Sequence, residues 1–527
     1  MANRSLFRST PGRRLPNTDA VNEAGGTAYR LDEKHALAQL AATGCLNGTF
    51  YASAESQLDA VLELAQRVEP EFVARAALYA RREARTKDMP ALLVAVLSVR
   101  SPGLMAEVFD RVIDTPKMLR NFVQIVRSGV VGRKSLGSLP KRMVRQWLDA
   151  RDDAQLFHAS VGNDPSLADV IKLVHPKPTS PQRAALYAYL IGRPHETAAL
   201  PEAVQAYEAF KRSQAKKRDV PDVPFQMLTA LELRARDWMA ISRQATWQTT
   251  RMNLNTFLRH GVFDDRGMVE LIAQRLADPQ LVRRSRVLPY QLLTAYTNAS
   301  DALPHAIREA LQDAMEAALV NVPAIDGKAF VLPDVSGSMQ CPITGYRKGS
   351  TSKVRCVDVS ALVAAAVLRK NPSAEVLPFE CDVVTSRKAR LNPRDTVLTN
   401  ARKLAAVGGG GTNCSAPLRR LNERKAKGDL VLYVSDNQSW IGSNANTWMG
   451  REATETLKQW QIFKRRNPRA KMVCVDIQPY TTVQAPERDD ITHVAGFSDA
   501  VFGLVAAVAS GDATAGHWVR QIENQTL

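Results

Sequence analysis

Residues 330–340, FVLPDVSGSMQ, decide the fold of the C-terminal part of this chain. An apolar run leads directly into a cluster of oxygen donors formed by Asp334, Ser336 and Ser338. A short apolar run bounded by Gly, Ser and Asp is typical of a buried strand. We therefore predict a strand over residues 329–333 that ends where three oxygen-bearing side chains begin.

Further apolar runs of strand length follow this stretch and alternate with helical segments. Strands are predicted over residues 374–380, 429–435 and 471–477, and a closing helix over residues 497–511. Such alternation is typical of an α/β domain with a largely parallel sheet covered on both faces. Residues 323–527 are therefore predicted to form one α/β domain.

The predicted strand ends carry the candidate metal ligands. Ligands of open α/β sheets bind at the carboxyl ends of the strands. Asp436 ends the strand over 429–435, and Thr412 follows the four glycines at 408–411, where the backbone can turn tightly. Two carboxylates and three hydroxyls form a hard-oxygen set that suits Mg²⁺. The alternative, that Ser336 and Ser338 only cap the next helix, leaves Thr412 and Asp436 unexplained.

The region before this domain has a helical pattern from about residue 35 to residue 320. Helices are expected, for example, over residues 103–112, 118–127, 141–150, 181–191 and 252–259, each separated by a short break. A chain of helical hairpins without strands predicts an α-solenoid of the HEAT type over residues 1–322. An irregular helical domain is the alternative, because no strict repeat period is visible.

Composition narrows the class of protein. The 527 residues carry a net charge of +17, which favours a polyanionic partner, nucleic acid before a membrane surface. The six cysteines form no C-x-x-C pair, and the basic N-terminus lacks the apolar segment of a secretory signal. No apolar run is long enough to span a bilayer. We expect a soluble cytoplasmic protein with reduced thiols and no membrane partner.

Several motifs together resemble a known family. DVSGSM, GGGGT and the strand-end Asp436 resemble the metal-ion-dependent adhesion site of von Willebrand factor A domains. The helical part, with LRNFVQIVRSGVVGRKSLGSLPKRMVRQWL and the LVHPKP stretch that carries His175 and Lys177, resembles the Ro/TROVE family of RNA-binding proteins. The resemblance covers nearly the whole chain. Pro333 before the metal aspartate, and Asn437 where many A domains have glycine, depart from the family pattern.

The resemblance implies a monomeric ring of HEAT-like repeats closed by the A domain, without catalytic activity. It implies binding of small non-coding Y-like RNA on the basic outer surface. Single-stranded ends of misfolded or structured RNA would enter the central hole, in RNA quality control or a stress response. An exoribonuclease tethered through the RNA is a further implied partner.

Phosphate binding requires Arg and Lys within reach of the RNA backbone. Two clusters of the helical region provide them, one in a helix–loop–helix and one around the H-x-K-P-like motif. The candidate RNA-binding residues are Arg120, Arg127, Arg133, Lys134, Lys141, Arg142, Arg145, Lys172, His175 and Lys177.

Two other classes of function stay open on sequence grounds. A scaffold protein would use the metal to bind a carboxylate of a protein partner, and its basic helices would only be solvated. A metal-dependent nuclease would use the strand-end carboxylates, although no P-loop, catalytic triad or paired-metal carboxylate set is present.

Overall fold

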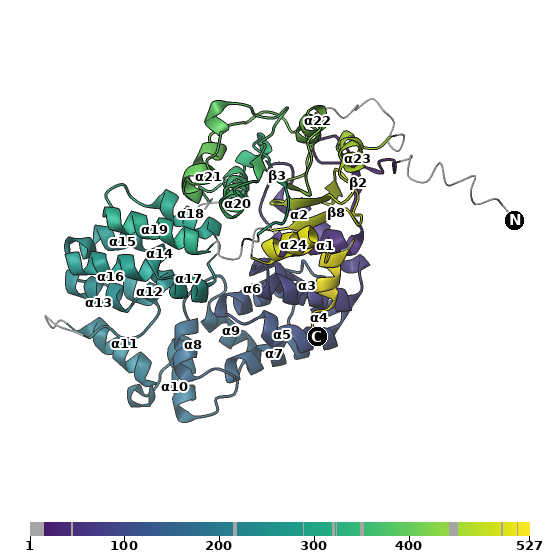
Figure 1. Ribbon diagram of the computed structural model, residues 1–527. Helices are drawn as coiled ribbons and strands as arrows, with labels where there is room; N and C mark the ends of the chain where they lie inside the picture. Colours follow the sequence, from purple (N-terminus) through teal and green to yellow (C-terminus); the bar gives the residue numbers. More distant parts are fainter. Residues whose placement is uncertain are drawn as a thin grey trace. The chain divides into compact units, whose positions relative to one another are not determined.

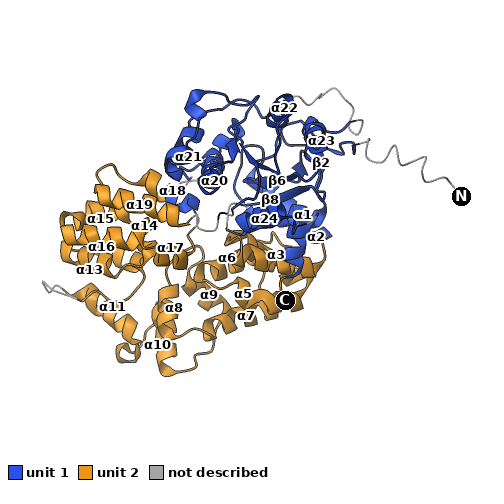
Figure 2. Cartoon of the chain, in the orientation of Figure 1, with its two compact units in different colours: residues 1–67, 288–294, 319–524 blue, residues 68–287, 295–318, 525–527 orange. Residues whose placement is uncertain are grey.

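The chain divides into two compact units in a computed structural model (Figure 2). Unit 1 comprises residues 1–67, 288–294 and 319–524, and unit 2 comprises residues 68–287, 295–318 and 525–527. The structure describes residues 15–43, 46–213, 219–287, 289–318, 322, 324–347, 352–441, 452–496, 499–513 and 515–527. Cys45 lies outside these residues. The described residues up to 67, which we assigned to the helical domain, belong to unit 1.

Unit 2 is a succession of helices joined by short connections (Figure 1). Proline occupies the first turn of several of them, where its missing N–H removes no helical hydrogen bond. The helices of unit 2 are α3 (Pro70–Arg82), α4 (Asp88–Arg100), α5 (Pro102–Val112), α6 (Pro116–Arg127), α7 (Ser138–Asp149), α8 (Asp153–Ala159), α9 (Leu167–Val174), α10 (Pro181–Leu190), α11 (Glu202–Arg212), α12 (Phe225–Thr229), α13 (Ala235–Gln244), α14 (Trp247–Met252), α15 (Leu254–Arg259), α16 (Arg266–Ala277), α17 (Pro279–Ser285) and α19 (His305–Ala318).

Neighbouring helices of unit 2 pack in pairs along the chain. Helix α3 packs on α4 and α5, α4 on α6, and α16 on α19. The predicted helical solenoid is confirmed. One predicted helix, over residues 252–259, is wrong in its bounds, because Asn253 separates α14 from α15 and caps both of them. Helix α18 (Pro289–Asn298) begins in unit 1 and ends in unit 2.

Unit 1 is built on a five-stranded parallel sheet of order β4–β3–β5–β6–β8. Its strands are β3 (Ala329–Pro333), β4 (Glu375–Val376), β5 (Leu430–Ser435), β6 (Lys471–Asp476) and β8 (Ile491–Ala495). The helices are α20 (Cys356–Lys370), α21 (Val397–Ala405), α22 (Ala416–Glu423), α23 (Glu455–Arg466), α24 (Asp499–Ser510) and α25 (His517–Glu523). The predicted α/β domain is confirmed. The strand predicted over 374–380 is only two residues long, and β8 was not predicted.

The N-terminal segment contributes to unit 1 from the other end of the chain. Strands β1 (Ala20–Val21) and β2 (Thr27–Arg30) form a small antiparallel sheet with β7 (Thr482–Val483). Helices α1 (Glu33–Thr43) and α2 (Ala54–Arg67) follow, and α1 packs against β8 and α25. The fold of unit 1 therefore needs residues from both ends of the sequence. None of the helices in the described ranges is long and apolar enough to cross a bilayer.

Two buried histidines join α1 to the parallel sheet. The ring nitrogen Nε2 of His35 lies 3.1 Å from the carbonyl of His493, and Nε2 of His493 lies 2.8 Å from the carbonyl of Ala485. Burial, together with the nearby His35, lowers the pKa of His493 to about 3. Burial also lowers the pKa of His35. Both rings are therefore neutral in the folded protein near neutral pH.

We expect this pair to destabilise the fold in acid. In the unfolded chain His493 takes up a proton near its ordinary pKa of 6.5, whereas the folded state resists protonation down to about 3. Its contribution to the free energy of unfolding is therefore complete above pH 6.5 and decreases as the pH falls. Between about pH 7.5 and about pH 5 the wild type should lose about 2 kcal/mol more than His493→Gln. Urea denaturation of both proteins at the two pH values measures the difference. An equal loss in both would show that His493 is protonated in the folded state.

Candidate functional site: a buried oxygen cluster and a basic helical face

The parallel register of β3 and β5 brings two carboxylates to one edge of the sheet. Pro333, the last residue of β3, pairs with Val434 of β5, so Asp334 and Asp436 leave neighbouring strands at the same level. Both carboxylates are buried, with 0% and 2% exposure. The predicted convergence of the strand ends is present in the structure.

Short hydrogen bonds hold the loop after β3 around Asp334. One carboxylate oxygen, Oδ1, accepts from the backbone N–H of Ser336 at 2.9 Å, and Oδ2 accepts from the hydroxyl of Ser435 at 2.6 Å. The hydroxyls of Ser336 and Ser338 lie 3.3 Å apart, and the Ser338 side chain also hydrogen-bonds to Asp436. The loop thus directs carboxylate and hydroxyl oxygens to one point.

The glycine-rich loop delivers the fifth predicted ligand, Thr412. Gly408 has φ +91°, and a Cβ there would lie 2.1 Å from the carbonyl oxygen of Val335. The N–H of Gly409 donates to the same carbonyl at 2.9 Å. The close approach of the two loops therefore requires glycine at position 408. Thr412 follows, 1% exposed, and its carbonyl accepts from the N–H of Trp440 at 3.1 Å.

The two carboxylates are electrostatically suited to a cation. Burial, together with the nearby charge of Asp436, raises the pKa of Asp334 to about 7. Burial likewise raises the pKa of Asp436. A bound cation would offset both effects, since it favours the ionised form of each group. Hydroxyl and carboxylate oxygens without sulfur or imidazole fit a hard divalent ion such as Mg²⁺. The residues present can therefore hold the metal.

The structure also places two residues at this edge that the sequence prediction omitted, Tyr51 and Asp476. The phenol of Tyr51, on the segment before α2, hydrogen-bonds to the side chains of Ser338 and Thr412. Asp476 ends β6 and accepts hydrogen bonds from Gln39, at 3.0 Å, and from Asn437. The sequence could have indicated Asp476, because it is the carboxylate at the carboxyl end of the strand predicted over residues 471–477. It could not have indicated Tyr51, because Tyr51 lies nearly 300 residues before the metal loop.

Asn437 adopts the left-handed conformation that glycine usually provides. Its φ is +58°, which asparagine tolerates better than most residues. Its N–H donates to the hydroxyl of Ser435 at 3.0 Å. The departure from the family pattern at this position therefore preserves the backbone turn after Asp436.

Some of the predicted RNA-binding residues have structural roles in unit 2. Arg120 is only 9% exposed, and its guanidinium donates to the carbonyl of Ala159 at 3.3 Å. Arg133 donates to the carbonyls of Ser98 and Ser135, at 2.9 and 3.0 Å, and so organises the loop before α7. Arg120 and Arg133 are therefore left out of the surface considered for RNA.

The remaining predicted residues are partly or fully exposed on α6, the loop before α7, α7, α9 and the segment after α9. Helix α9 packs on both α6 and α7 (Figure 1). Arg127 and Lys172 both act on the charge of Asp169, and Arg145 donates to the carbonyl of Val174 at 2.6 Å. These contacts bring the two predicted clusters together. We call the following set the basic face: Arg127, Lys134, Lys141, Arg142, Arg145, Lys172, His175 and Lys177.

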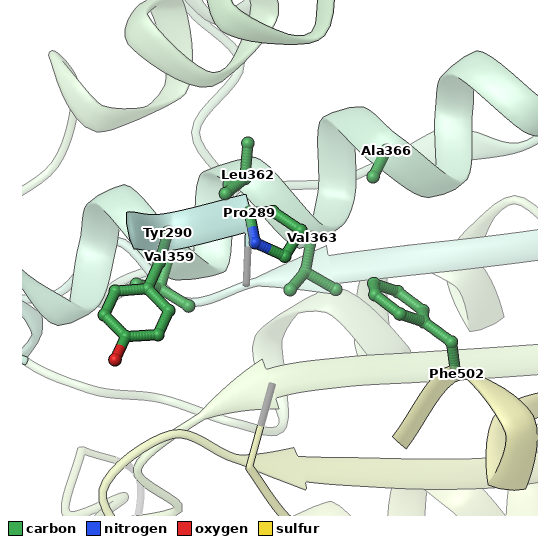
Figure 3. A pocket seen from close by; sticks show the side chains of 7 residues that line it. All are labelled: Pro289, Tyr290, Val359, Leu362, Val363, Ala366 and Phe502. Carbon is green, nitrogen blue, oxygen red and sulfur yellow. The ribbon is translucent and has the colours of Figure 1, made fainter. Parts of the chain in front are cut away.

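An apolar pocket elsewhere in unit 1 is too small for a ligand. Figure 3 shows Pro289, Val363 and Phe502 closing around it. Its free volume is about 10 Å³, which is at most the space for one water molecule. It is a packing defect and not a binding site.

The sheet order, the metal loop and the helical succession define the class of protein: a von Willebrand factor A domain joined to a helical solenoid. Residues 328–509 match the family model described as the Ro60 vWA domain. The chain is 25% identical to the RNA-binding protein RO60 of Deinococcus radiodurans, over 95% of this chain and 97% of that protein. It is 24% identical to the RNA-binding protein RO60 of Caenorhabditis elegans, over 58% of this chain and 48% of that protein.

A solved structure agrees with the sequence comparisons. The crystal structure of the Deinococcus radiodurans RO (RSR) protein matches with a TM-score of 0.61 and 23% identity, over 92% of this chain and all of that chain. The resemblance to the Ro/TROVE family that the sequence motifs predicted is confirmed.

We expect neutralisation of Asp334 to have opposite effects with and without metal. The raised folded pKa of about 7 means that ionisation of Asp334 destabilises the metal-free fold as the pH rises through 7. At about pH 8 without metal, Asp334→Asn should therefore melt at a higher temperature than the wild type. Addition of Mg²⁺ should raise the melting temperature of the wild type by several degrees and that of the variant not at all.

Calorimetry with and without a chelator makes this comparison. Asp313→Asn, an exposed carboxylate of α19, is the matched control and should respond to Mg²⁺ as the wild type does. If Asp334→Asn shows the same rise in melting temperature with Mg²⁺ as the wild type, Asp334 is not a ligand of the ion.

Substitution of a buried arginine of unit 2 should lower the stability more than substitution of an exposed one. Arg120→Met leaves the Ala159 carbonyl without its donor and should lower the free energy of unfolding by about 2 kcal/mol. Arg142→Met, at an exposed position of α7, should change it by less than about 0.5 kcal/mol. Equal effects in urea denaturation would contradict the structural role of Arg120.

Proposed function

We propose that this protein binds RNA without catalysing its cleavage, and that the basic face of unit 2 contacts the RNA backbone. The observation that carries the proposal is the basic face itself. None of its side chains forms an ion pair with another residue of the described ranges. Cations that are not paired within the protein are available to phosphate groups, which dominate affinity for nucleic acid. Two relatives, one matching 95% of this chain and the other 58%, are named RNA-binding proteins.

The shape of the basic face suits a backbone contact more than base recognition. Lys134 and Arg142 are exposed, and the loop between α6 and α7 has positive φ at Gly129, Gly132 and Gly137. Such a loop can present backbone N–H groups beside its cations. His175 ends α9 with a φ of +49° and is exposed next to Pro176. A planar imidazole at this place can stack on an unpaired base.

The finer parts of the proposal rest on the Ro/TROVE resemblance. The RNA on the outer basic surface would be a small non-coding, Y-like RNA. Single-stranded ends of misfolded or structured RNA would enter a central hole of the helical ring. The protein would act as a monomer in RNA quality control or a stress response in the cytoplasm, with an exoribonuclease tethered through the RNA.

We further propose that Asp334, Ser336, Ser338, Thr412 and Asp436 hold Mg²⁺. The ion would neutralise the two buried carboxylates and tie the loops after β3 and β5 together. This role is structural, and the RNA contacts would not depend on it. A single ion with hydroxyl ligands is poorly suited to activating water, which favours a non-catalytic protein.

The burial of the metal site also bears on the scaffold alternative. In a metal-dependent scaffold, a carboxylate of a partner protein would complete the metal shell. Here the phenol of Tyr51 already hydrogen-bonds to Ser338 and Thr412, so a partner would first have to displace it. This geometry favours the RNA-binding function over the scaffold.

Charge reversal on the basic face should weaken RNA binding. Lys134→Glu combined with Arg142→Glu removes two phosphate contacts and adds repulsion, so affinity for a structured RNA with a single-stranded tail should fall at least about tenfold at moderate salt. Asp334→Ala should leave the affinity within about twofold. Fluorescence anisotropy at several salt concentrations measures both effects.

Arg259→Glu combined with Arg266→Glu changes the net charge equally at exposed positions outside the basic face. This control should bind like the wild type. Equal losses in the basic-face variant and in Asp334→Ala would instead show that the metal site touches the RNA. Salt-insensitive binding, or none, in the wild type would overturn the proposed function. RNA cleavage that is abolished by Asp334→Ala would overturn its non-catalytic part.

A further inference from the structure

A second basic surface lies in unit 1, at the edge of the sheet opposite the metal site. A groove of about 410 Å³ is lined by Lys328, Lys427, Arg466 and Arg469, together with Asp429 and buried Asn467. We call it the edge groove. Its volume falls in the range of small-ligand sites, and its lining includes no aromatic side chain.

The parallel topology brings these cations together. Strands β3, β5 and β6 are neighbours in one parallel sheet, so all three begin at the same edge. Lys328 immediately precedes β3, Lys427 lies three residues before β5, and Arg469 lies two residues before β6. The metal site is at the carboxyl ends of β3 and β5. Strands of five to six residues separate the two edges by about 17–20 Å, so the edge groove is a separate site.

The floor of the groove is fixed by buried groups. The side chain of Asn467 accepts from the N–H of Gly428 at 3.1 Å and donates to the carbonyl of Ala426 at 3.2 Å. A Cβ at Gly428 would lie 2.4 Å from the ring of Phe330, so only glycine fits. The segments before β5 and β6 are therefore held at a set distance, which gives their cations a defined spacing.

The cations of the groove are not neutralised within unit 1. The carboxylate of Asp429 accepts from the backbone N–H of Lys328 at 2.9 Å. Lys427 and Arg469 are exposed and form no ion pair with another described residue. Arg466 donates to the side chain of Asn422, but its Nε is buried and has no hydrogen-bond acceptor. The ammonium of Lys328 donates to the carbonyl of Ser373 and keeps its charge. Four cations against one carboxylate therefore leave the groove positive.

We propose that the edge groove binds backbone phosphates of single-stranded RNA, as a contact additional to the basic face. Guanidinium and ammonium groups at fixed spacing match consecutive phosphates. The absence of aromatic rings from the lining means that bases are not stacked there, so the contact is independent of sequence. The identity of the polyanion rests on the proposed RNA-binding function, whereas the charge and geometry of the groove do not.

The test uses the full-length protein and fluorescently labelled oligouridylate. Lys427→Glu combined with Arg469→Glu should reduce affinity at least about fivefold. It should also flatten the dependence of log K on log salt by about 1.4, the value for two single-strand phosphate contacts. Arg387→Glu combined with Lys388→Glu, an exposed pair outside the groove, is the matched control and should bind like the wild type. Thermal melting verifies that all proteins are folded.

The same variants are measured in the Lys134→Glu, Arg142→Glu background to separate the two surfaces. A further loss on adding the groove substitutions supports two contacts. No change from the groove substitutions in either background overturns the edge groove and leaves the basic face intact. Absence of salt-sensitive binding in the wild type overturns the proposed function itself. Inorganic tripolyphosphate serves as a second probe. If it binds in a manner sensitive to Lys427→Glu while oligouridylate binding is unaffected, the groove takes free polyphosphate and the proposal is wrong.

Discussion

The parallel pairing of β3 with β5 is the constraint on which the chemistry of unit 1 depends. Because the strands run the same way, every segment that enters the sheet does so at one edge and every segment that leaves does so at the other. The leaving segments carry Asp334 and Asp436, and the entering segments carry Lys328 and Lys427. One register therefore separates an anionic edge from a cationic edge. An antiparallel pairing of the same two strands would mix the two kinds of residue at each edge.

The acidic groups of the sheet edge and the basic groups of the surface differ in their exposure to solvent. The acidic groups at the proposed metal site, Asp334 and Asp436, are buried and shielded from solvent, so ionisation of both is unfavourable without a counter-ion. Most of the basic groups that concern RNA are exposed, and their interactions are weakened by salt. Arg120 and Arg133, which the sequence analysis predicted to bind RNA, are exceptions, because their guanidinium groups donate to backbone carbonyls of unit 2. The net charge of the chain does not distinguish an exposed arginine from a buried one. For a residue on a helix, that difference depends on which face of the helix it occupies.

Local pattern was sufficient for the elements that are apolar along their length. Strands β3, β5 and β6 and the helices α5, α6 and α10, which have proline in their first turn, were predicted nearly to the residue. The structure brings the side chains of the proposed metal ligands together, and metal binding itself stays a prediction. Strand β8 contains Thr492 and His493 and lacks the continuous apolar run of a buried strand. The small sheet of β1, β2 and β7 was missed because each strand is at most four residues long and its partner is far away in sequence. Tyr51 was missed for the same reason. The burial of Arg120 could not be predicted, because it depends on the path of the loop around Gly162.

The pairing of the two chain ends has a consequence for synthesis. Tyr29 pairs with Val483, roughly 450 residues later in translation. At typical elongation rates these partners emerge from the ribosome about 20–90 s apart. During that interval α1 can pack on α2 but lacks its partners β8 and α25, and the edge of β2 that pairs with β7 stays unpaired. The segment of β2 and α1 therefore stays prone to non-native association until β7 and β8 have been translated. A chain released before residue 482 would lack β7 and β8, and an A domain produced from residue 323 onward would lack β2 and α1. Either product would miss one partner of each contact.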